Sequence, residues 1–147
     1  MALELPGDTA LIDDLLALLA KGGIDYTLFF RHFCDFVPGQ VNTSLRDLCP
    51  DRAAFAAWAA RYGTRLEAET RTAAARRAAM RQVNPAHVLR NYLAETAIRA
   101  AVDQGDYREI EQLRQALAQP FEPPPEFARY AAPPPDWGRG IAVSCSS

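Results

Sequence analysis

The stretch MRQVNPAHVLRNYLAETAIRAA, residues 80–101, carries the clearest helix signal in the chain. Asn84 has a short acceptor side chain suited to an N-cap, and Pro85 follows at a first helical position, where a missing N–H costs nothing. Gly105 can adopt the left-handed conformation that ends a helix. Apolar and small side chains recur between these ends at steps of three and four residues: Leu89, Tyr92, Leu93, Thr96, Ala97 and Ala100. We therefore predict a helix that begins at Asn84 and Pro85 and buries this stripe.

The most apolar part of the chain lies near its N-terminus. Asp8 is a candidate N-cap for a helix over residues 9–21, and Gly22 and Gly23 end that helix. Its apolar face is unusually wide and comprises Leu11, Ile12, Leu15, Leu16, Leu18 and Leu19. We expect a helix this apolar to be contacted on two sides.

Aspartates placed before periodic segments predict further helices. They are Asp25 before an aromatic helix over residues 26–35, Asp51 before a helix over about 52–62, and Asp106 in a capping box with Glu109 before a helix over 107–118. Residues 64–82 have helical propensity but are polar, which favours a solvated pair of helices. No strand pattern of any length is visible, so we predict an all-α protein.

The composition changes after residue 119. Seven of the eleven prolines lie between Pro120 and Pro135, and the two triple-proline runs among them cannot be the interior of a helix. We expect this tail to be an extended strap, partly in the polyproline II form, that is held onto the helical body by its aromatic side chains. These are Phe121, Phe127, Tyr130 and Trp137. The sequence thus predicts two regions, a helical segment over residues 1–119 and a proline-rich strap over residues 120–147.

The overall composition gives no general attraction to nucleic acid or membranes, because 16 basic and 18 acidic residues leave a formal charge of −2. The longest strictly apolar runs, residues 15–20 and 53–60, are far shorter than the ~18 residues needed to span a bilayer. No secretory signal is visible at the N-terminus. Three cysteines do not make a disulfide scaffold in a chain of 147 residues, so we expect a reducing cytoplasm.

The arginine-rich stretch between residues 61 and 81 raises the question of nucleic-acid binding. It carries six arginines against only Glu67 and Glu69. No aromatic side chain is interleaved after Tyr62, as stacking on bases would require. A helix that faces solvent or a protein partner is therefore favoured.

Candidate catalytic side chains are few. The two histidines, His32 and His87, have no cluster of cysteines or acids around them at metal-ligand spacing, and the helical phase of His87 favours a surface position. Cys34 and Cys49 are interpreted as small hydrophobic residues. Cys145, in the terminal Ser-Cys-Ser-Ser, is expected to be an exposed thiol able to exchange with another cysteine, although an incidental cysteine is the more common case. We assign no catalytic, nucleotide-binding or metal-binding residue.

A set of short motifs resembles the C-terminal part of the selenoprotein O family. In chain order they are DYTLFFR at residues 25–31, VNP at 83–85, VLRNYLA at 88–94, AI at 97–98, GDY at 105–107, PPDW at 134–137 and SCSS at 144–147. The NPxxVLRN block and the terminal CSS are the most specific of them, and the resemblance covers nearly the whole chain. Animal members of that family carry selenocysteine where Cys145 stands here, which implies a redox role for Cys145, through a reversible disulfide with a cysteine elsewhere in the enzyme.

The resemblance implies a fold and an activity. The family has a protein-kinase-like fold and transfers AMP from ATP to Ser, Thr or Tyr hydroxyls of proteins, with Mg²⁺ or Mn²⁺ as the metal. Its nucleotide-binding and catalytic residues lie in regions to which this chain has no counterpart. We therefore expect the helical C-terminal part of a protein-kinase-like fold, with an extended proline-rich C-terminal strap, that is inactive and needs no cofactor on its own.

Two functions from different classes follow. The first is a C-terminal segment of a bacterial protein adenylyltransferase, whose partners are the N-terminal kinase-like region, in cis or in trans, and the protein substrates of the full-length enzyme. The second is a free-standing helical interaction module without enzymatic activity. Neither function includes nucleic acid or a membrane as a partner.

Overall fold

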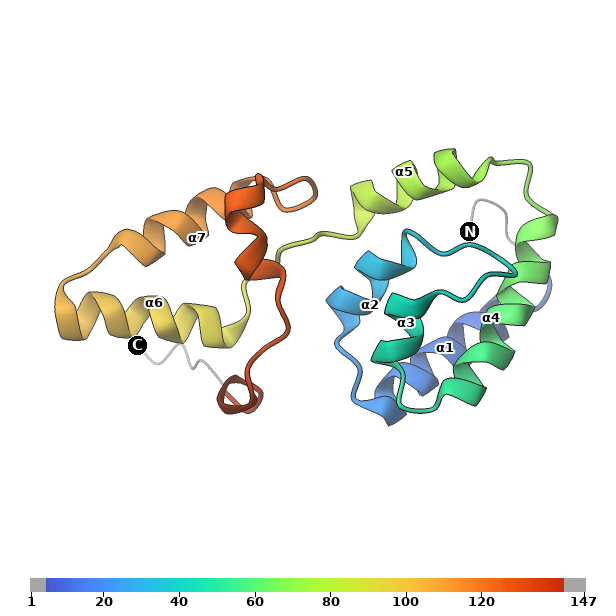
Figure 1. Cartoon of the computed structure of the whole chain (residues 1–147), viewed down its shortest axis with the longest axis horizontal. Coiled ribbons are helices and arrows are strands. Elements are labelled where there is room, and N and C mark those ends of the chain that lie inside the picture. The colour runs from blue at the N-terminus through green and yellow to red at the C-terminus, as the bar shows by residue number, and fades with distance from the viewer. Residues whose placement is uncertain (1–4, 142–147) are drawn as a thin grey trace. The chain divides into compact units, whose positions relative to one another are not determined.

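The computed structural model describes residues 5–141 and contains helices but no strand within that range (Figure 1). The all-α prediction is therefore confirmed. The chain forms two compact units, of which the first ends at Asn84 and the second begins at Pro85. The predicted boundary between residues 119 and 120 lies inside the second unit.

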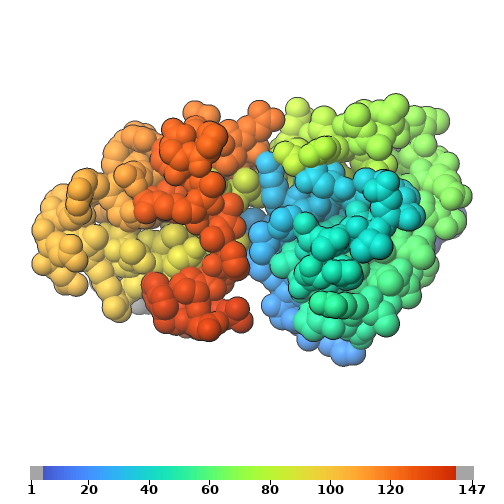
Figure 2. All heavy atoms as spheres, viewed as in Figure 1, coloured from blue at the N-terminus to red at the C-terminus, as the bar shows by residue number. Residues whose placement is uncertain are grey.

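The first unit contains five helices: α1 (Asp8–Gly22), α2 (Tyr26–Phe33), α3 (Thr43–Leu48), α4 (Arg52–Glu67) and α5 (Ala73–Val83). α1 packs against α4, and α3 contacts both α2 and α4. In the space-filling view, α3 and the loop before it form part of the visible face of this unit, coloured cyan (Figure 2).

The predicted caps of this unit are confirmed with one exception. The Asp25 side chain accepts the Leu28 N–H at 2.8 Å, and the Asp51 side chain accepts the Ala54 N–H at 2.9 Å. Asp8, however, is the first residue inside α1, and its carboxylate accepts the Leu5 N–H at 3.0 Å. The cap position belongs to Gly7, which adopts a φ of 94° that an aspartate would take only under strain.

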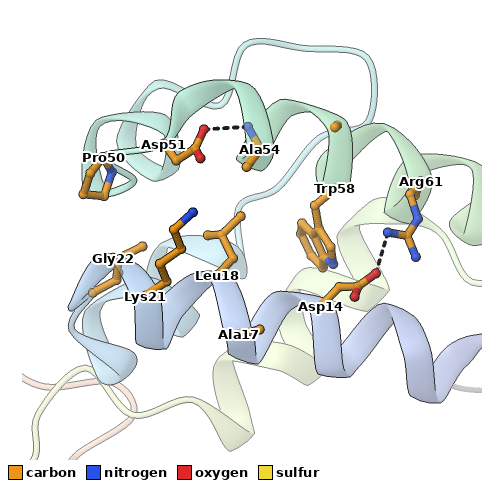
Figure 3. Close-up of a pocket in the computed structure, with 12 residues that line it drawn as sticks. Asp14, Ala17, Leu18, Lys21, Gly22, Pro50, Asp51, Ala54, Trp58 and Arg61 are labelled. Atoms are coloured by element: carbon orange, nitrogen blue, oxygen red, sulfur yellow. Dashed lines mark hydrogen bonds and ion pairs between the residues drawn. The ribbon is translucent and has the colours of Figure 1, made fainter.

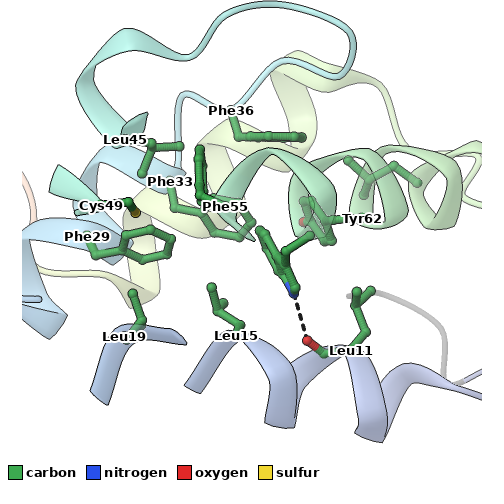
Figure 4. Packing of buried hydrophobic residues seen from close by; sticks show 12 residues of the cluster. Leu11, Leu15, Leu19, Phe29, Phe33, Phe36, Leu45, Cys49, Phe55 and Tyr62 are labelled. Atoms are coloured by element: carbon green, nitrogen blue, oxygen red, sulfur yellow. Dashed lines mark hydrogen bonds between the residues drawn. The ribbon is translucent and has the colours of Figure 1, made fainter. Parts of the chain in front are cut away.

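An aromatic core holds the first unit together (Figure 4). Leu11, Leu15 and Leu19 of α1 are buried against rings from α2 and α4. The Trp58 indole N–H donates to the Leu11 carbonyl at 2.8 Å. The only polar group of the largest side chain in this core is therefore hydrogen-bonded. The other buried members of this cluster are Phe29, Phe33, Phe36, Leu45, Cys49, Phe55, Tyr62 and Leu66.

α5 is attached to this unit differently, because none of its residues is buried. The Arg76 guanidinium donates to the Phe36 carbonyl at 3.2 Å, and Arg77 and Arg81 pair with the Asp35 carboxylate at 2.6 and 3.0 Å. The expectation of two solvated helices holds for α5. It fails for the end of α4, which continues beyond the expected end and buries Leu66.

The second unit contains α6 (Asn91–Gln104), α7 (Arg108–Ala118) and two short 3-10 helices, η1 (Pro125–Ala131) and η2 (Asp136–Gly138). α6 packs against α7, and η1 packs against α7. The buried hydrophobic cluster of this unit comprises Tyr92, Leu93, Ala97, Leu113, Ala116 and Tyr130.

The predicted start of the central helix is wrong. α6 begins at Asn91 rather than at Pro85, because the chain before it is used in tertiary hydrogen bonds. The N–H groups of Ala86 and His87 both donate to the Pro120 carbonyl, at 2.7 and 3.2 Å. Leu89 therefore lies outside the helix and is 56% exposed. The predicted end is confirmed, since Gly105 has a φ of 65°.

The start of α7 and the proline-rich segment also differ from the prediction. Tyr107 occupies the N-cap position of α7, and Asp106 accepts the Arg108 N–H at 3.0 Å instead of forming a capping box with Glu109. The proline-rich segment is extended only in places, with polyproline II angles at Pro124, Ala132 and Pro135, because η1 and η2 occupy the stretches between.

Candidate functional site

The buried cysteines are poor nucleophiles. Cys34 and Cys49 are both free and buried. Burial raises the pKa of the Cys34 thiol, and it raises the pKa of the Cys49 thiol to about 11. Both groups are therefore protonated near neutral pH, which confirms their interpretation as small hydrophobic residues. Cys145 lies outside the described residues, so its redox role stays a prediction.

The expectation that His87 is a surface residue is wrong. Its side chain is 1% exposed, and its ring lies edge-on to the Tyr130 ring with the centroids 6.2 Å apart. The error follows from the misplaced helix start, since a helical phase has no meaning for a residue that precedes the helix. His32 lies half-buried in α2, in the other unit. Within residues 5–141, no three side chains of the types His, Cys, Asp and Glu come together as a metal site.

The arginines between residues 61 and 81 are largely engaged within the first unit. Arg61 pairs with Asp14 at 2.6 Å, and the Arg65 guanidinium binds the Asp8 carboxylate through two nitrogens, with 2.9 Å between Nη2 and Oδ2. The side chains of Arg65 and Asp8 are only 9% and 11% exposed. The bonds from Arg65 lower the pKa of Asp8 to about 2. Sequence reasoning missed this pair, because its members are 57 positions apart, and because Asp8 was interpreted as an N-cap and Arg65 as part of a solvated helix.

An apolar cleft is the strongest candidate site of the first unit. It has a volume of about 530 Å³ and lies between α5 and the helices α1, α2 and α4. Its floor consists of core side chains: Leu11, Leu15, Phe33, Trp58 and Tyr62. Four further apolar side chains line it and are 40–71% exposed: Ile12, Leu16, Tyr26 and Val83. Arg71 and Arg76 supply positive charge to its lining, whereas the Glu69 side chain, which also lines it, is only 4% exposed and pairs with Arg65 at 3.5 Å. A cleft of this size and composition suits apolar side chains of a partner.

A second pocket opens on the other side of α1 (Figure 3). It has a volume of about 470 Å³ and lies between the C-terminal half of α1 and the N-terminal half of α4. Leu18 and Trp58 form part of its apolar lining, and Lys21 extends across it toward the start of α4. The ion pair between Asp14 and Arg61 lies at one end of the pocket, so these two charges already neutralise each other. A third pocket of about 530 Å³ lies between α4 and the loop that carries Pro38 and Val41.

The second unit holds a polar cluster around Tyr130. This ring is 2% exposed, and its hydroxyl donates to the Glu109 carboxylate at 3.0 Å. The Arg129 guanidinium donates to the same carboxylate at 2.8 Å, to Gln112 and to the Tyr130 hydroxyl. Burial and the bond to Glu109 raise the pKa of Tyr130. These contacts join the proline-rich segment to α7 and confirm that an aromatic side chain attaches it.

Gly138 has a packing role in the same unit. A Cβ at this position would lie 2.8 Å from the Tyr92 Cβ, so only glycine allows the η2 backbone to approach α6 so closely. Trp137 lies edge-on to the Tyr92 ring at 6.0 Å but remains 61% exposed. In the described part of the chain, no helix is both long and apolar enough to cross a membrane.

Comparison with known proteins identifies the family. The model of the family described as protein adenylyltransferase SelO matches residues 2–118. Proteins named protein nucleotidyltransferase YdiU are similar over nearly the whole chain. The one from Thiobacillus denitrificans is 53% identical over 146 residues, which are 97% of this chain and 30% of the relative. Those from Ralstonia nicotianae and Pseudomonas paraeruginosa are 49% and 46% identical, over 96% and 100% of this chain and 28% and 30% of their own lengths.

The chain thus spans about 30% of the length of the curated relatives it matches. The match extends over both units, since residues 2–118 run from α1 to the end of α7. The resemblance inferred from the short motifs is therefore confirmed. This chain belongs to the protein adenylyltransferase SelO family.

Proposed function

We propose that this chain forms the C-terminal helical region of a protein adenylyltransferase and supports a catalytic region that it does not itself contain. The observation that carries this proposal is the family match over residues 2–118 together with the 30% coverage of the relatives. The remaining 70% of such a relative is long enough to hold a nucleotide-binding domain of its own.

The reaction of the whole enzyme requires groups of a particular kind. A protein hydroxyl oxygen forms a bond with the α-phosphorus of ATP, pyrophosphate leaves, and the hydroxyl proton passes to a base. Mg²⁺ or Mn²⁺ neutralises the phosphate charge during such a transfer. We assign none of these steps to residues 5–141, whose clefts are lined mainly by apolar side chains.

The role left to the described helices is to support the catalytic region. The cleft beside α5 is open at the surface of a well-packed unit, and its core provides a rigid base for contacts. In this proposal the family activity depends on the chain as a structural part of the enzyme. A redox role for Cys145, through a disulfide with a cysteine of the catalytic region, is a further part of the proposal.

The test uses ATP labelled at its α-phosphate, with Mg²⁺ or Mn²⁺ and a mixture of acceptor proteins. The purified chain is expected to transfer no label, whereas the full-length Thiobacillus denitrificans relative serves as the positive control. A chimera, in which this chain replaces the matching region of that relative, is expected to transfer label. Label transferred by the chain alone would overturn the proposal, and so would an inactive chimera that folds normally.

A further inference from the structure

α1 carries two apolar faces, and the first unit buries only one of them. Leu11, Leu15 and Leu19 lie in the core at 3–6% exposure. Ile12 and Leu16, displaced by about 100° around the helix, are 45% and 40% exposed. The core of the first unit therefore covers one apolar face of α1, and the face that carries Ile12 and Leu16 stays exposed.

The exposed face of α1 continues into the cleft beside α5. Ile12 and Leu16 line that cleft together with Tyr26 of α2 and Val83 of α5, which are 59% and 71% exposed. Four large, exposed apolar side chains from three helices thus converge on one hollow. Such a concentration differs from the single exposed apolar residues that any surface carries and is typical of a protein interface.

The charged side chains of the cleft restrict what it can receive. Arg71 and Arg76 line the cleft, whereas the Glu69 side chain is only 4% exposed and pairs with Arg65 at 3.5 Å, so the accessible charge at the rim is positive while the floor is apolar. This arrangement suits an amphipathic helix, whose apolar stripe enters the hollow and whose flanking charged residues meet the rim.

The comparison with the relatives indicates where that helix comes from. Nearly all of this chain aligns with proteins more than three times as long, so about 70% of each relative is available to contact it. We propose that the cleft formed by Ile12, Leu16, Tyr26 and Val83 is the docking surface for an apolar helix face of the remaining adenylyltransferase chain. This inference rests on the proposed function and names the surface through which it acts.

The experiment compares one substitution in two proteins. Ile12→Asp is introduced into this chain and into the chimera in which this chain replaces the matching region of the Thiobacillus denitrificans relative. Ile98→Asp is the matched control, since Ile98 is also an isoleucine within a helix and is 46% exposed, but it belongs to α6 and does not line the cleft. Melting temperature is measured for every variant, and the isolated chain is also examined by size-exclusion chromatography over a range of concentrations.

We expect Ile12→Asp to lower the melting temperature of the chimera while leaving that of the isolated chain nearly unchanged. Ile98→Asp should shift the two proteins equally. The proposal is overturned if Ile12→Asp has the same effect in both proteins. It is equally overturned if the isolated chain forms dimers that Ile12→Asp dissociates, because a second copy would then occupy the cleft.

AMP transfer by the unsubstituted chimera distinguishes the failure of this inference from that of the proposed function. An active chimera that is insensitive to Ile12→Asp refutes the docking surface alone. An inactive but folded chimera that is destabilised by Ile12→Asp refutes the proposed function and keeps the docking surface.

Discussion

The two units achieve their packing by different means. Among the described residues, the first unit buries a cluster of twelve apolar side chains, half of them aromatic, whereas the second buries six, of which Ala97 and Ala116 are small. The second unit compensates with hydrogen bonds, which connect the Tyr130 hydroxyl to α7 through Glu109 and Arg129. The first unit thus depends on the apolar area it removes from water, and the second on a few polar contacts and one close glycine approach.

Different substitutions should therefore disrupt the two units. Loss of a large ring leaves a cavity in a core that cannot collapse around it. Loss of a single hydroxyl leaves a buried polar group without its partner but removes little apolar contact.

Truncation of the aromatic core should produce the largest loss. Phe29 is 0% exposed and contacts the rings of Phe33 and Phe55, so Phe29→Ala should lower the stability of the first unit by about 3–5 kcal/mol. Hydrogen–deuterium exchange read by peptide would report each unit separately. Phe121→Ala, at a 38% exposed position of the second unit, is the control. Equal loss of protection in both units after Phe29→Ala would show that the two units unfold together.

Removal of the buried hydroxyl should affect the second unit alone. Tyr130→Phe keeps the ring but deletes the contacts to Glu109 and Arg129, and we expect a loss of about 1–2 kcal/mol. Hydrogen–deuterium exchange of the α7 amides, measured at increasing urea concentrations, would determine this loss of stability. Tyr107→Phe, at a 66% exposed position, should change nothing. An unchanged stability in Tyr130→Phe would show that the polar cluster does not hold the proline-rich segment.

The pH dependence should differ between Asp8 and Asp106. The pKa of each is lowered from 3.8 to about 2, chiefly by a guanidinium: Arg65 for Asp8 and Arg108 for Asp106. A lowered pKa in the folded state means that the stabilisation is present above pH 4 and is lost as the pH falls from about 4 to about 2. Only Asp8 joins two helices, since its partner lies in α4, whereas Arg108 is two residues from Asp106.

The measurement is the free energy of unfolding of the wild type and of two variants between pH 5 and pH 2. Asp8→Asn should destabilise the first unit above pH 4, and this deficit should shrink toward pH 2 as the wild type loses its own ion pair. Asp106→Asn should give a smaller deficit, confined to the start of α7. A deficit of Asp8→Asn that does not change with pH would refute the ionic origin.

Detachment of α5 should produce the smallest effect. Asp35→Asn removes the ion pairs to Arg77 and Arg81, whose side chains are 56% and 35% exposed, so we expect less than about 1 kcal/mol. The α5 amides should exchange faster while the core of the first unit stays protected. Asp47→Asn, which removes surface pairs to Arg46 and Arg52, is the control. A large global loss in Asp35→Asn would show that α5 belongs to the cooperative core.

The helical class, the family and the helix boundaries that depend on local chemistry could be predicted from the amino-acid sequence. Asp25 and Asp51 cap their helices because a short acceptor reaches an N–H three residues ahead, and Gly23 and Gly105 end theirs because glycine tolerates a positive φ. The wide apolar face of α1 was also legible, since it follows from the helical period alone.

The features that depend on partners distant in the sequence could not be predicted, because they arise from the packing of the folded chain. The Pro120 carbonyl takes the N–H groups of Ala86 and His87, so a locally favourable helix start at Pro85 is not used and His87 becomes buried. Asp8 binds Arg65 across the first unit instead of serving as a cap. A local signal such as a cap is worth about 1 kcal/mol, and the burial of a large apolar side chain, worth about 1.5–3 kcal/mol, outweighs it.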